Sequence, residues 1–472
     1  MRIQTITARI ACFRARFRMH GEADPALGKI RQDRGTNGAS RQVSGDEGEA
    51  HKGLSHNATW MLVGRVFNFF FQAAYFTLLA RLLEVREYGI FAGAYALVNT
   101  ITPYSALGAA MLLLRYVSID PTMAKRYWGN ALATTSVFTL LAAIAVLSYA
   151  AWTHSIGTPF LVISIILANC LFSQITQLGS SLVFALGNAR LSALMTTVSN
   201  LGRLVILLVM KLTMGHATAS QWSVGLLVAS FIAAAPILLQ VRRQIGDVHF
   251  DLQLLKQRFG EGLGFSFAGT TEAVNNDLDK VMLANYGMDA QNGFYTLAYR
   301  VVDFGTSPIV ALTSAVVQRH FVLSTAGVRP VMRLALKSLG VSVVMGIAIG
   351  VMIRIGAPLL PLVAGSGFSG AIAVLNILCW LPLIRGVHQS CGSALTGIGK
   401  QNWRTAAQAI AALLNVALNL LWIQRFGWRG AAWSTLASDG ALAILNVGLF
   451  LALPRIVGRN GNYQNQPDPE GV

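Results

Sequence analysis

Long apolar segments recur along almost the whole chain, and each has about the length that a helix needs to cross a lipid bilayer. Roughly twenty consecutive apolar residues span the hydrocarbon core. We predict about twelve spans, which begin near Ala58, Tyr88, Ala131, Phe160, Leu191, Trp222, Leu263, Phe294, Leu339, Ile372, Ala406 and Ala431. Only 12% of the 472 residues are charged, against roughly 25% in soluble domains. We therefore expect an all-α polytopic membrane protein.

The positively charged residues indicate how the spans are oriented, because Lys and Arg gather on the cytoplasmic side of membrane proteins. With the N-terminus inside, most of the 37 Lys and Arg residues fall in predicted cytoplasmic segments. The predicted external side holds at most Arg81, Arg86, Lys211, Lys280, Arg354, Arg425 and Arg429. Both termini are therefore expected to be cytoplasmic, and the excess positive charge serves orientation rather than nucleic-acid binding.

The two ends of the chain differ from its apolar middle. Residues 1–57 are rich in Arg, Gly, Ser and Gln and lack apolar periodicity, which predicts a disordered basic cytoplasmic tail. A non-native extension from a misassigned start codon is the alternative. Residues 456–472 are predicted to form a second cytoplasmic tail. Because no nucleotide-binding loop, zinc-protease or serine-hydrolase motif occurs and the four cysteines lack metal-ligand spacing, we expect no enzyme and no metal site.

A weak internal repeat relates the two halves of the chain. Sliding the chain against itself brings identical residues into register, at Gly89–Gly293, Ala94–Ala298, Tyr95–Tyr299, Val98–Val302, Thr102–Thr306 and Arg115–Arg319. An even number of spans in each half gives both halves the same orientation, so the repeat is parallel. We predict two six-helix lobes at residues 58–241 and 263–455, joined by a cytoplasmic linker at residues 242–262. Two such lobes enclose a central cleft that opens to each side in turn.

Arginines within predicted spans are the first candidates for a binding site, because an intramembrane charge normally faces a cavity or a partner. They are Arg65, Arg203, Arg300 and Arg385. Polar side chains share helix faces with them or form a stripe in the second span, at Asn68, Gln72, Tyr95, Asn99, Asn200 and Gln389. A planar guanidinium suits phosphate oxygens, so these residues are predicted to bind an anionic glycolipid. Alternatively, the arginines pair with acids that hold helices together, or extend to the membrane surface.

Acidic residues in the seventh and eighth predicted spans are the candidates for ion coupling, namely Glu272, Asp277, Asp279 and Asp303. A carboxylate in a membrane cleft can take up a proton or hold Na⁺ and so couple transport to a gradient. The choice between H⁺ and Na⁺ stays open, and no other cofactor is expected. The alternative is that Asp279 pairs with Lys280, and Asp303 with Arg300, at the external mouth. Asp439, alone in the last span, is predicted to be a structural partner for an arginine.

Several short motifs, in a fixed order, resemble those of Wzx-type polysaccharide flippases in the multidrug/oligosaccharidyl-lipid/polysaccharide exporter superfamily. They are Ala80–Leu83 with Glu87–Phe91, Asp279 with Gly293–Tyr295 and Ala298–Arg300, and Ala394–Lys400 with Phe426–Ala432. The resemblance covers residues 54–457 and implies a MATE-like fold with two lobes around a cationic cavity. It implies a flippase of the bacterial inner membrane that moves a polyprenyl-diphosphate-linked oligosaccharide to the periplasmic leaflet, for O-antigen or exopolysaccharide synthesis.

The resemblance also implies partners, which are the lipid-linked oligosaccharide, membrane lipids, a polysaccharide polymerase and a chain-length regulator. Nucleic acid is not among them. Two other functions remain open, a multidrug or toxin cation antiporter of the same superfamily and a non-transporting scaffold of a polysaccharide synthesis complex. Buried arginines would repel a cation, and a scaffold needs little intramembrane charge, so a flippase is favoured.

Overall fold

The described part of the protein is helical throughout. The structure, a computed structural model, describes the backbone of residues 39–153 and 158–458 and the side chains of residues 71–149 and 158–454. Within these residues all regular structure is helix and no strand occurs, which confirms the all-α class. The chain divides into two units, residues 1–59 and 60–472, and every contact discussed below lies in the second. The side chains of both predicted tails lie outside the described residues.

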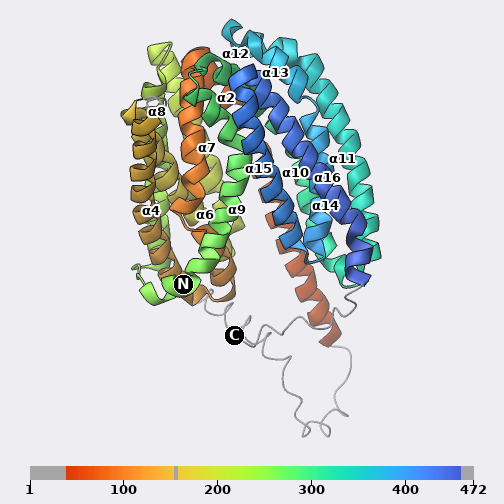
Figure 1. Cartoon of the computed structure of the whole chain (residues 1–472). Coiled ribbons are helices and arrows are strands. Elements are labelled where there is room, and N and C mark those ends of the chain that lie inside the picture. The colour runs from red at the N-terminus through yellow and green to blue at the C-terminus, as the bar shows by residue number, and fades with distance from the viewer. Residues whose placement is uncertain (1–38, 154–157, 459–472) are drawn as a thin grey trace, which may run out of the picture. The chain divides into compact units, whose positions relative to one another are not determined.

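The first half of the chain forms one set of helices (Figure 1). They are α2 (Ala39–Ser105), α3 (Ala109–Leu112), α4 (Ala124–Thr153), α5 (Pro159–Ile166), α6 (Gln174–Ala185), α7 (Ala189–Met214) and α8 (Ala219–Ile245). Two π-helical segments, η3 (Leu113–Val117) and η5 (Leu167–Ser173), and a short turn, η4 (Pro121–Met123), complete this set. Helix α2 contains the first two predicted spans, and the chain changes direction between them at Glu84, whose φ of 58° is not helical.

The second half forms another set of helices, drawn from green to blue in Figure 1. They are α9 (Leu252–Asn285), α10 (Asp289–Ser324), α11 (Val328–Gly356), α12 (Leu360–Ala364), α13 (Gly370–Leu378), α14 (Leu381–Gly397), α15 (Gln401–Phe426) and α16 (Trp428–Gly458). Two short 3₁₀ turns, η6 (Ala357–Leu359) and η7 (Ser366–Ser369), lie between α11 and α13. The order of helices thus follows the order of the predicted spans.

Local sequence explains where several helices begin and end. Thr218 and Gln221 form a capping box at the start of α8, in which each side chain accepts a hydrogen bond from the other residue's backbone N–H. The Asp251 carboxylate accepts from the Leu254 N–H and so starts α9. Gly427, with a φ of 56°, ends α15 in a conformation that a side chain would disfavour. These short-range signals place the helix ends within the apolar pattern.

Most of the long helices have the length and the apolar composition that a membrane-spanning helix needs. Among the described residues, eight helices are long and apolar enough to cross a membrane, or up to ten if two bent pairs each count as one span. The bent pairs are Phe71–Ser105 with Ala109–Val117, at 41°, and Ser366–Leu378 with Leu381–Gly397, at 45°. Helix α9, the predicted seventh span, is not among these candidates, because its polar run makes it less apolar than a membrane-crossing helix. Large apolar side chains on the outside, such as Leu212 and Ile444, suit contact with lipid.

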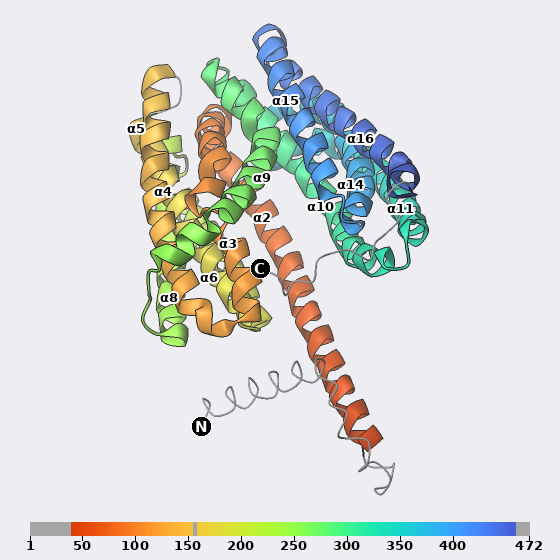
Figure 2. The ribbon, with the colours of Figure 1, turned by 60° about the horizontal axis from the view of Figure 1, so that its bottom comes forward.

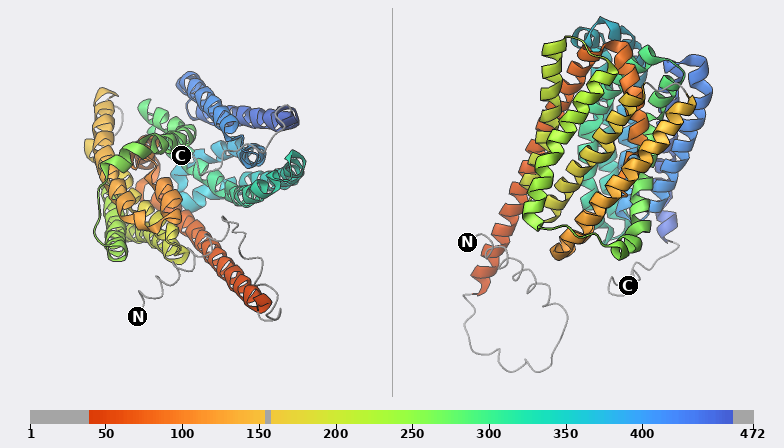
Figure 3. Two further views of the ribbon diagram at one scale, coloured as in Figure 1. Left: turned by 90° about the horizontal axis from the view of Figure 1, so that it is seen from below. Right: turned by 90° about the vertical axis from the view of Figure 1, so that its left-hand side faces the viewer.

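Two helix groups are visible within the second unit. Helices α4 to α8 pack on one another, α10, α11, α14 and α16 pack on one another, and α15 packs on α16. Figure 2 and Figure 3 show these groups as separate sets of ribbons, orange to yellow-green and green to blue. Helix α9 contacts both groups, since it meets α3 and α4 as well as α10 and α15. Its polar run also meets both halves, because Asp277 accepts a hydrogen bond from Asn99 of α2 and Asn275 donates one to Asp439 of α16.

The two groups touch closely at one end, where glycines let the backbones meet. A Cβ atom on Gly89 would overlap the carbonyl oxygen of Asp289, and a Cβ on Gly293 would overlap that of Val85. The contact is reciprocal, because the predicted repeat matches Gly89 with Gly293 and Val85 with Asp289. Such a self-complementary contact is the form that two-fold related elements make. It is consistent with the parallel repeat predicted from the sequence.

Candidate functional site

Three neighbouring cavities lie along the inner faces of the two groups. The arginine cavity, about 190 Å³, is lined by α2, α7, α8, α9 and α10 and includes Gln72, Tyr75, Tyr95, Asn200, Arg203, Asp277, Lys280 and Arg300. The open polar cavity, about 700 Å³, is lined mainly by α9, α10, α14, α15 and α16 and includes Glu272, Asp303, Arg385, His388, Gln389, Gln401, Arg404 and Asp439. A connecting cavity of about 370 Å³ shares Asp277 with the first and Glu272 and Asn276 with the second.

The arginine cavity holds two guanidinium groups that keep unused donors. Arg203 donates from Nη2 to the Ser173 hydroxyl at 2.7 Å, and its Nε is buried without a hydrogen-bond partner among the side chains that the structure describes. Arg300 lies 3.8 Å from Asp303, and within residues 71–149 and 158–454 its buried Nε has no hydrogen-bond partner either. Buried donors are almost always satisfied in folded proteins. The two arginines therefore have donor capacity available for an anion in this cavity.

Arg385 is arranged differently, because its guanidinium is already neutralised. Its Nη1 lies 2.7 Å from Asp303 and its Nε 3.1 Å from Asp439, while Nη2 donates to the Tyr299 hydroxyl at 2.5 Å. Three helices, α10, α14 and α16, meet through this side chain. The prediction that Asp439 partners an arginine is confirmed. For Arg385 the geometry favours the alternative of an ion pair that holds helices together.

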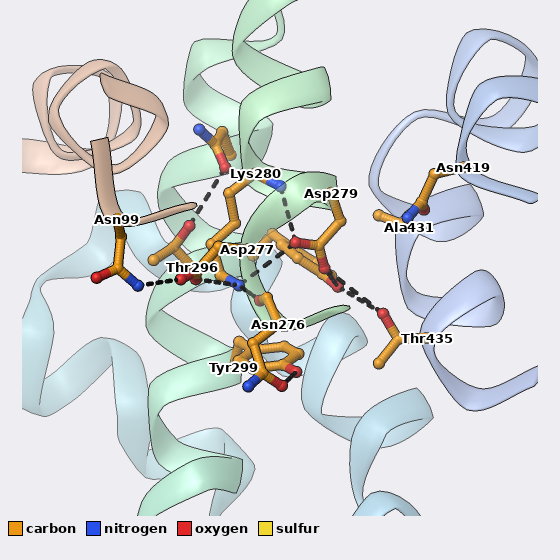
Figure 4. Close-up of polar contacts among 12 residues, drawn as sticks. Asn99, Asn276, Asp277, Asp279, Lys280, Thr296, Tyr299, Asn419, Ala431 and Thr435 are labelled. Atoms are coloured by element: carbon orange, nitrogen blue, oxygen red, sulfur yellow. Dashed lines mark hydrogen bonds and ion pairs between the residues drawn. The ribbon is translucent and has the colours of Figure 1, made fainter. Parts of the chain in front are cut away.

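Lys280 was predicted on the external side, and the structure shows that this was wrong. Its side chain is 1% exposed and lies inside the bundle, where Nζ is 3.1 Å from Asp277 and 3.3 Å from Asp279. Figure 4 shows Lys280 between these two carboxylates. The physical reason is that the two carboxylates offset its charge, so an ammonium group can remain in the low-dielectric interior. The alternative pairs, Asp279 with Lys280 and Asp303 with Arg300, are both present.

The four carboxylates predicted for ion coupling have unequal surroundings. Asp277 and Asp279 are buried beside Lys280, and Asp303 lies between Arg385 and Arg300. Glu272 instead lines the connecting and open polar cavities, is exposed, and makes no salt bridge among the described residues. Of the four, Glu272 is thus the carboxylate that faces these cavities without a salt bridge among the described residues, although Arg404 of the same cavity lies close enough to interact with it electrostatically.

The remaining predicted site residues divide between the cavities. Gln72, Tyr95 and Asn200 line the arginine cavity with Arg203 and Arg300, and Gln389 lines the open polar cavity with Arg385. Asn99 donates to Asp277 at 2.7 Å and also lines the connecting cavity. The side chains of Arg65 and Asn68 lie outside the described residues. The sequence thus grouped residues that the fold places in two compartments.

Arg404 and Tyr75 are among the cavity residues that the sequence analysis missed. Arg404 lines the open polar cavity and donates to the Thr396 hydroxyl at 3.1 Å. Tyr75 lines the arginine cavity one helical turn after Gln72, so the polar stripe of the first span could have included it. Arg404 gave no such signal, because it precedes the span that is predicted to begin near Ala406.

Comparison with protein families gives one match. Residues 54–317, more than half of the chain, match the family described as polysaccharide biosynthesis protein. The comparison with curated proteins gives no match.

Several solved structures of MOP superfamily transporters are similar to this chain. An inward-facing multidrug resistance MATE family transporter has a TM-score of 0.68 at 12% identity, covering 84% of this chain and 96% of its own. An outward-facing one has a TM-score of 0.54 at 14% identity, covering 86% and 97%. A superfamily transporter from Pyrococcus furiosus, whose binding pocket is described as having reverse polarity, has a TM-score of 0.58 at 12% identity, covering 85% and 96%. The likeness establishes the fold.

We predict that Arg385→Gln lowers stability markedly. Removing one partner from a buried ion pair costs about 3–5 kcal/mol, because the other charge is left uncompensated, and here two carboxylates would be left. Thermal unfolding of the purified protein measures this loss, and adding Asp439→Asn should restore part of it. Arg404→Gln, in the same cavity but without a salt bridge, is the matched control. An Arg385→Gln protein that unfolds like the wild type would contradict the structural role.

Proposed function

The chain belongs to the polysaccharide biosynthesis protein family and has the fold of a multi-pass membrane transporter, and on that premise we propose that it is a flippase for lipid-linked oligosaccharides. The resemblance to the polysaccharide flippases of the MOP superfamily is confirmed by this family and fold. We infer that the cargo is a polyprenyl-diphosphate-linked repeat unit, moved from the cytoplasmic to the periplasmic leaflet for surface polysaccharide synthesis. Family and fold indicate a transporter rather than an enzyme.

The arginine cavity is the observation that carries this proposal. Arg203 and Arg300 line one small cavity with spare donors, and an aromatic and amide lining surrounds them. Guanidinium groups bind phosphate oxygens through paired, charge-assisted hydrogen bonds. A diphosphate is the part of the proposed cargo with that chemistry. Arg65, Asn68, Gln72, Tyr95, Asn99 and Asn200 remain proposed contributors to this headgroup site.

The open polar cavity suits the sugar part of the cargo. Its carboxylates and arginines largely compensate each other, and it adds the amides of Asn275, Gln389, Gln401 and Gln408. Sugar hydroxyls both donate and accept hydrogen bonds, so they match such a lining better than a lipid chain does. Because the connecting cavity shares lining residues with both, we propose that a headgroup and its sugars occupy the two compartments together.

Alternating access requires that one end be closed while the cavities open at the other. Here Arg81 donates to the Val363 carbonyl at 2.6 Å and to the Leu362 carbonyl at 3.0 Å. The glycine contact between Gly89 and Gly293 lies at the same end. We infer that this is the periplasmic end and that the described state faces the cytoplasm. The higher TM-score to the inward-facing relative supports this assignment.

Coupling is proposed to rest on Glu272. Of the four predicted acids it alone faces both larger cavities without a salt bridge in the described structure, so its charge can change with access to each side. A proton is the ion that a single carboxylate can carry. Asp277, Asp279 and Asp303 are proposed to fix the charge balance around it.

Position in the cell and partners follow from the cargo. We propose that the protein lies in the bacterial inner membrane with two six-helix lobes at residues 58–241 and 263–455, a linker at residues 242–262, and cytoplasmic tails at residues 1–57 and 456–472. Both termini would be cytoplasmic. A polysaccharide polymerase and a chain-length regulator are proposed to receive the product on the other side.

A multidrug cation antiporter is the alternative that the fold relatives raise. Arg203 argues against it, because it makes no salt bridge among the described residues and a guanidinium group raises the free energy of a cation in the same cavity. A non-transporting scaffold would have no need for the connected cavities. Both alternatives are separated from a flippase by the first experiment below.

We predict that Arg203→Gln and Arg300→Gln each reduce flipping about tenfold or more, because each removes charge-assisted hydrogen bonds worth roughly 1.5–3 kcal/mol. The measurement is accumulation of lipid-linked oligosaccharide in the cytoplasmic leaflet of a deletion strain that carries each variant. The exposed Arg329→Gln is the charge-matched control and should rescue fully. Full rescue by both cavity variants would exclude the arginine cavity as the headgroup site.

A second prediction concerns Glu272→Gln, which keeps the shape of the side chain but cannot ionise. Flipping by this variant in proteoliposomes should no longer respond to an imposed pH gradient, whereas the wild type should accelerate severalfold. Glu261→Gln, a carboxylate held by Arg115 and Tyr116 near the start of α9, is the control that should keep the response. An unchanged pH response in Glu272→Gln would rule out this residue as the coupling group.

A third prediction uses the closed end. The Val85 Cβ lies 3.8 Å from the position a Cβ would take on Gly367, within the range of roughly 3.5–4.5 Å found in disulfides. In a chain whose native cysteines are replaced by serine, Val85→Cys with Gly367→Cys should cross-link and stop flipping, and a reductant should restore it. Each single cysteine variant is a control. Continued flipping by the fully cross-linked protein would contradict opening at this end.

A further inference from the structure

Lys280 is the most deeply buried cation among the described residues, and its surroundings are unusual for a lysine. Its Nζ donates to the Asn276 carbonyl and lies 3.1 Å from Asp277 Oδ1 and 3.3 Å from Asp279 Oδ1. The ring of Tyr299 covers it, with Nζ 4.0 Å from the ring centroid. An ammonium has three N–H donors, and here three oxygens accept them. Although Lys280 borders the arginine cavity, it has no donor left for a phosphate.

The oxygens around the ammonium are held by other helices. We call Asn276 O, Asp277 and Asp279 the lysine cage. Asn99 of α2 donates to Asp277 at 2.7 Å, and the Tyr295 hydroxyl of α10 donates to Asp279 at 2.5 Å. Figure 4 shows Asn99 beside Asp277. The positions of the carboxylates are therefore set by partners other than the ammonium that they surround.

A cage of two carboxylates and one carbonyl also has the composition that hard metal cations prefer. Two buried carboxylates need compensation, which a lysine or a free cation can supply. The carbonyl and the carboxylates converge on one point, and that point is where Nζ lies. The same oxygens would suit a sodium ion if the side chain were absent.

We propose that Lys280 is a tethered cation that fills an oxygen cage able to take a free alkali-metal ion, and that the protein therefore needs no sodium at this position. The inference goes beyond the proposed function, because it does not depend on the cargo. It also separates the roles of the acids: the cage keeps a fixed charge, and an exchangeable ion would have to act elsewhere.

The test compares the full chain and three variants by thermal unfolding in detergent, with sodium chloride or N-methylglucamine chloride at equal ionic strength. Lys280→Ala removes the ammonium and leaves space for an ion. Sodium should raise its unfolding temperature by roughly 3 °C or more, increasing with concentration as ligand binding requires. The wild type and Lys280→Arg, which keeps a tethered charge, should not respond to the exchange of cations.

Lys280→Met is the matched control for space, because it removes the charge and still fills the cage. It should be destabilised and should not respond to sodium. A sodium response equal in the wild type and Lys280→Ala would overturn the proposal, as would a Lys280→Ala protein indifferent to sodium. The proposal would also be overturned if Lys280→Met had the unfolding temperature of the wild type while Lys280→Ala stayed destabilised even in sodium. If neither neutral variant folds, the test rests on the wild type. A wild-type unfolding temperature that depends on sodium would contradict the proposal that Lys280 is a tethered cation.

Discussion

The cost of holding charge in a medium of low dielectric constant organises the interior of this protein. Arg385 is stable there because Asp303 and Asp439 compensate it, and Lys280 because two aspartates surround it. Arg385 and its two acids come from α14, α10 and α16, so their ion pairs also fix the packing of these three helices, whereas Lys280 and its two aspartates all lie on α9. What is left over is informative: Arg203 and Glu272 make no salt bridge among the described residues and face cavities. Function is proposed at the charges that packing leaves uncompensated.

Helix α9 carries both a structural charge cluster and the residue proposed for coupling. Its polar run makes it fail the test that its neighbours pass for membrane crossing, yet the same run supplies Glu272 and the lysine cage. Asp277 is held by α2 through Asn99, and Asp279 by α10 through Tyr295. A shift of α2 relative to α10 would therefore alter the hydrogen bonds that hold Asp277 and Asp279 in this polar run.

The sequence predicted the fold well because apolar length and local helix-end signals are properties of short segments. The capping box at Thr218 and the glycine at Gly427 can be recognised without knowing any distant contact. Asn200 and Arg203, which share one helix face, line the same cavity. Contacts between side chains of distant helices were harder to predict from the sequence. Lys280 was assigned outside because position along the chain cannot show that Asp277 and Asp279 enclose it, and the separation of Arg385 from Arg203 into two compartments depends on how distant helices pack.

The reciprocal contact of Gly89 and Gly293 has a consequence for the origin of the molecule. Each half presents the same small surface to the other, with a backbone carbonyl received over a glycine on both sides. A half-length protein with this surface could have met an identical copy of itself in the same way. Duplication and fusion of such a dimer would keep the contact while allowing the rest of each half to diverge. The unequal cavities of the two halves would then be later specialisations of one ancestral interior.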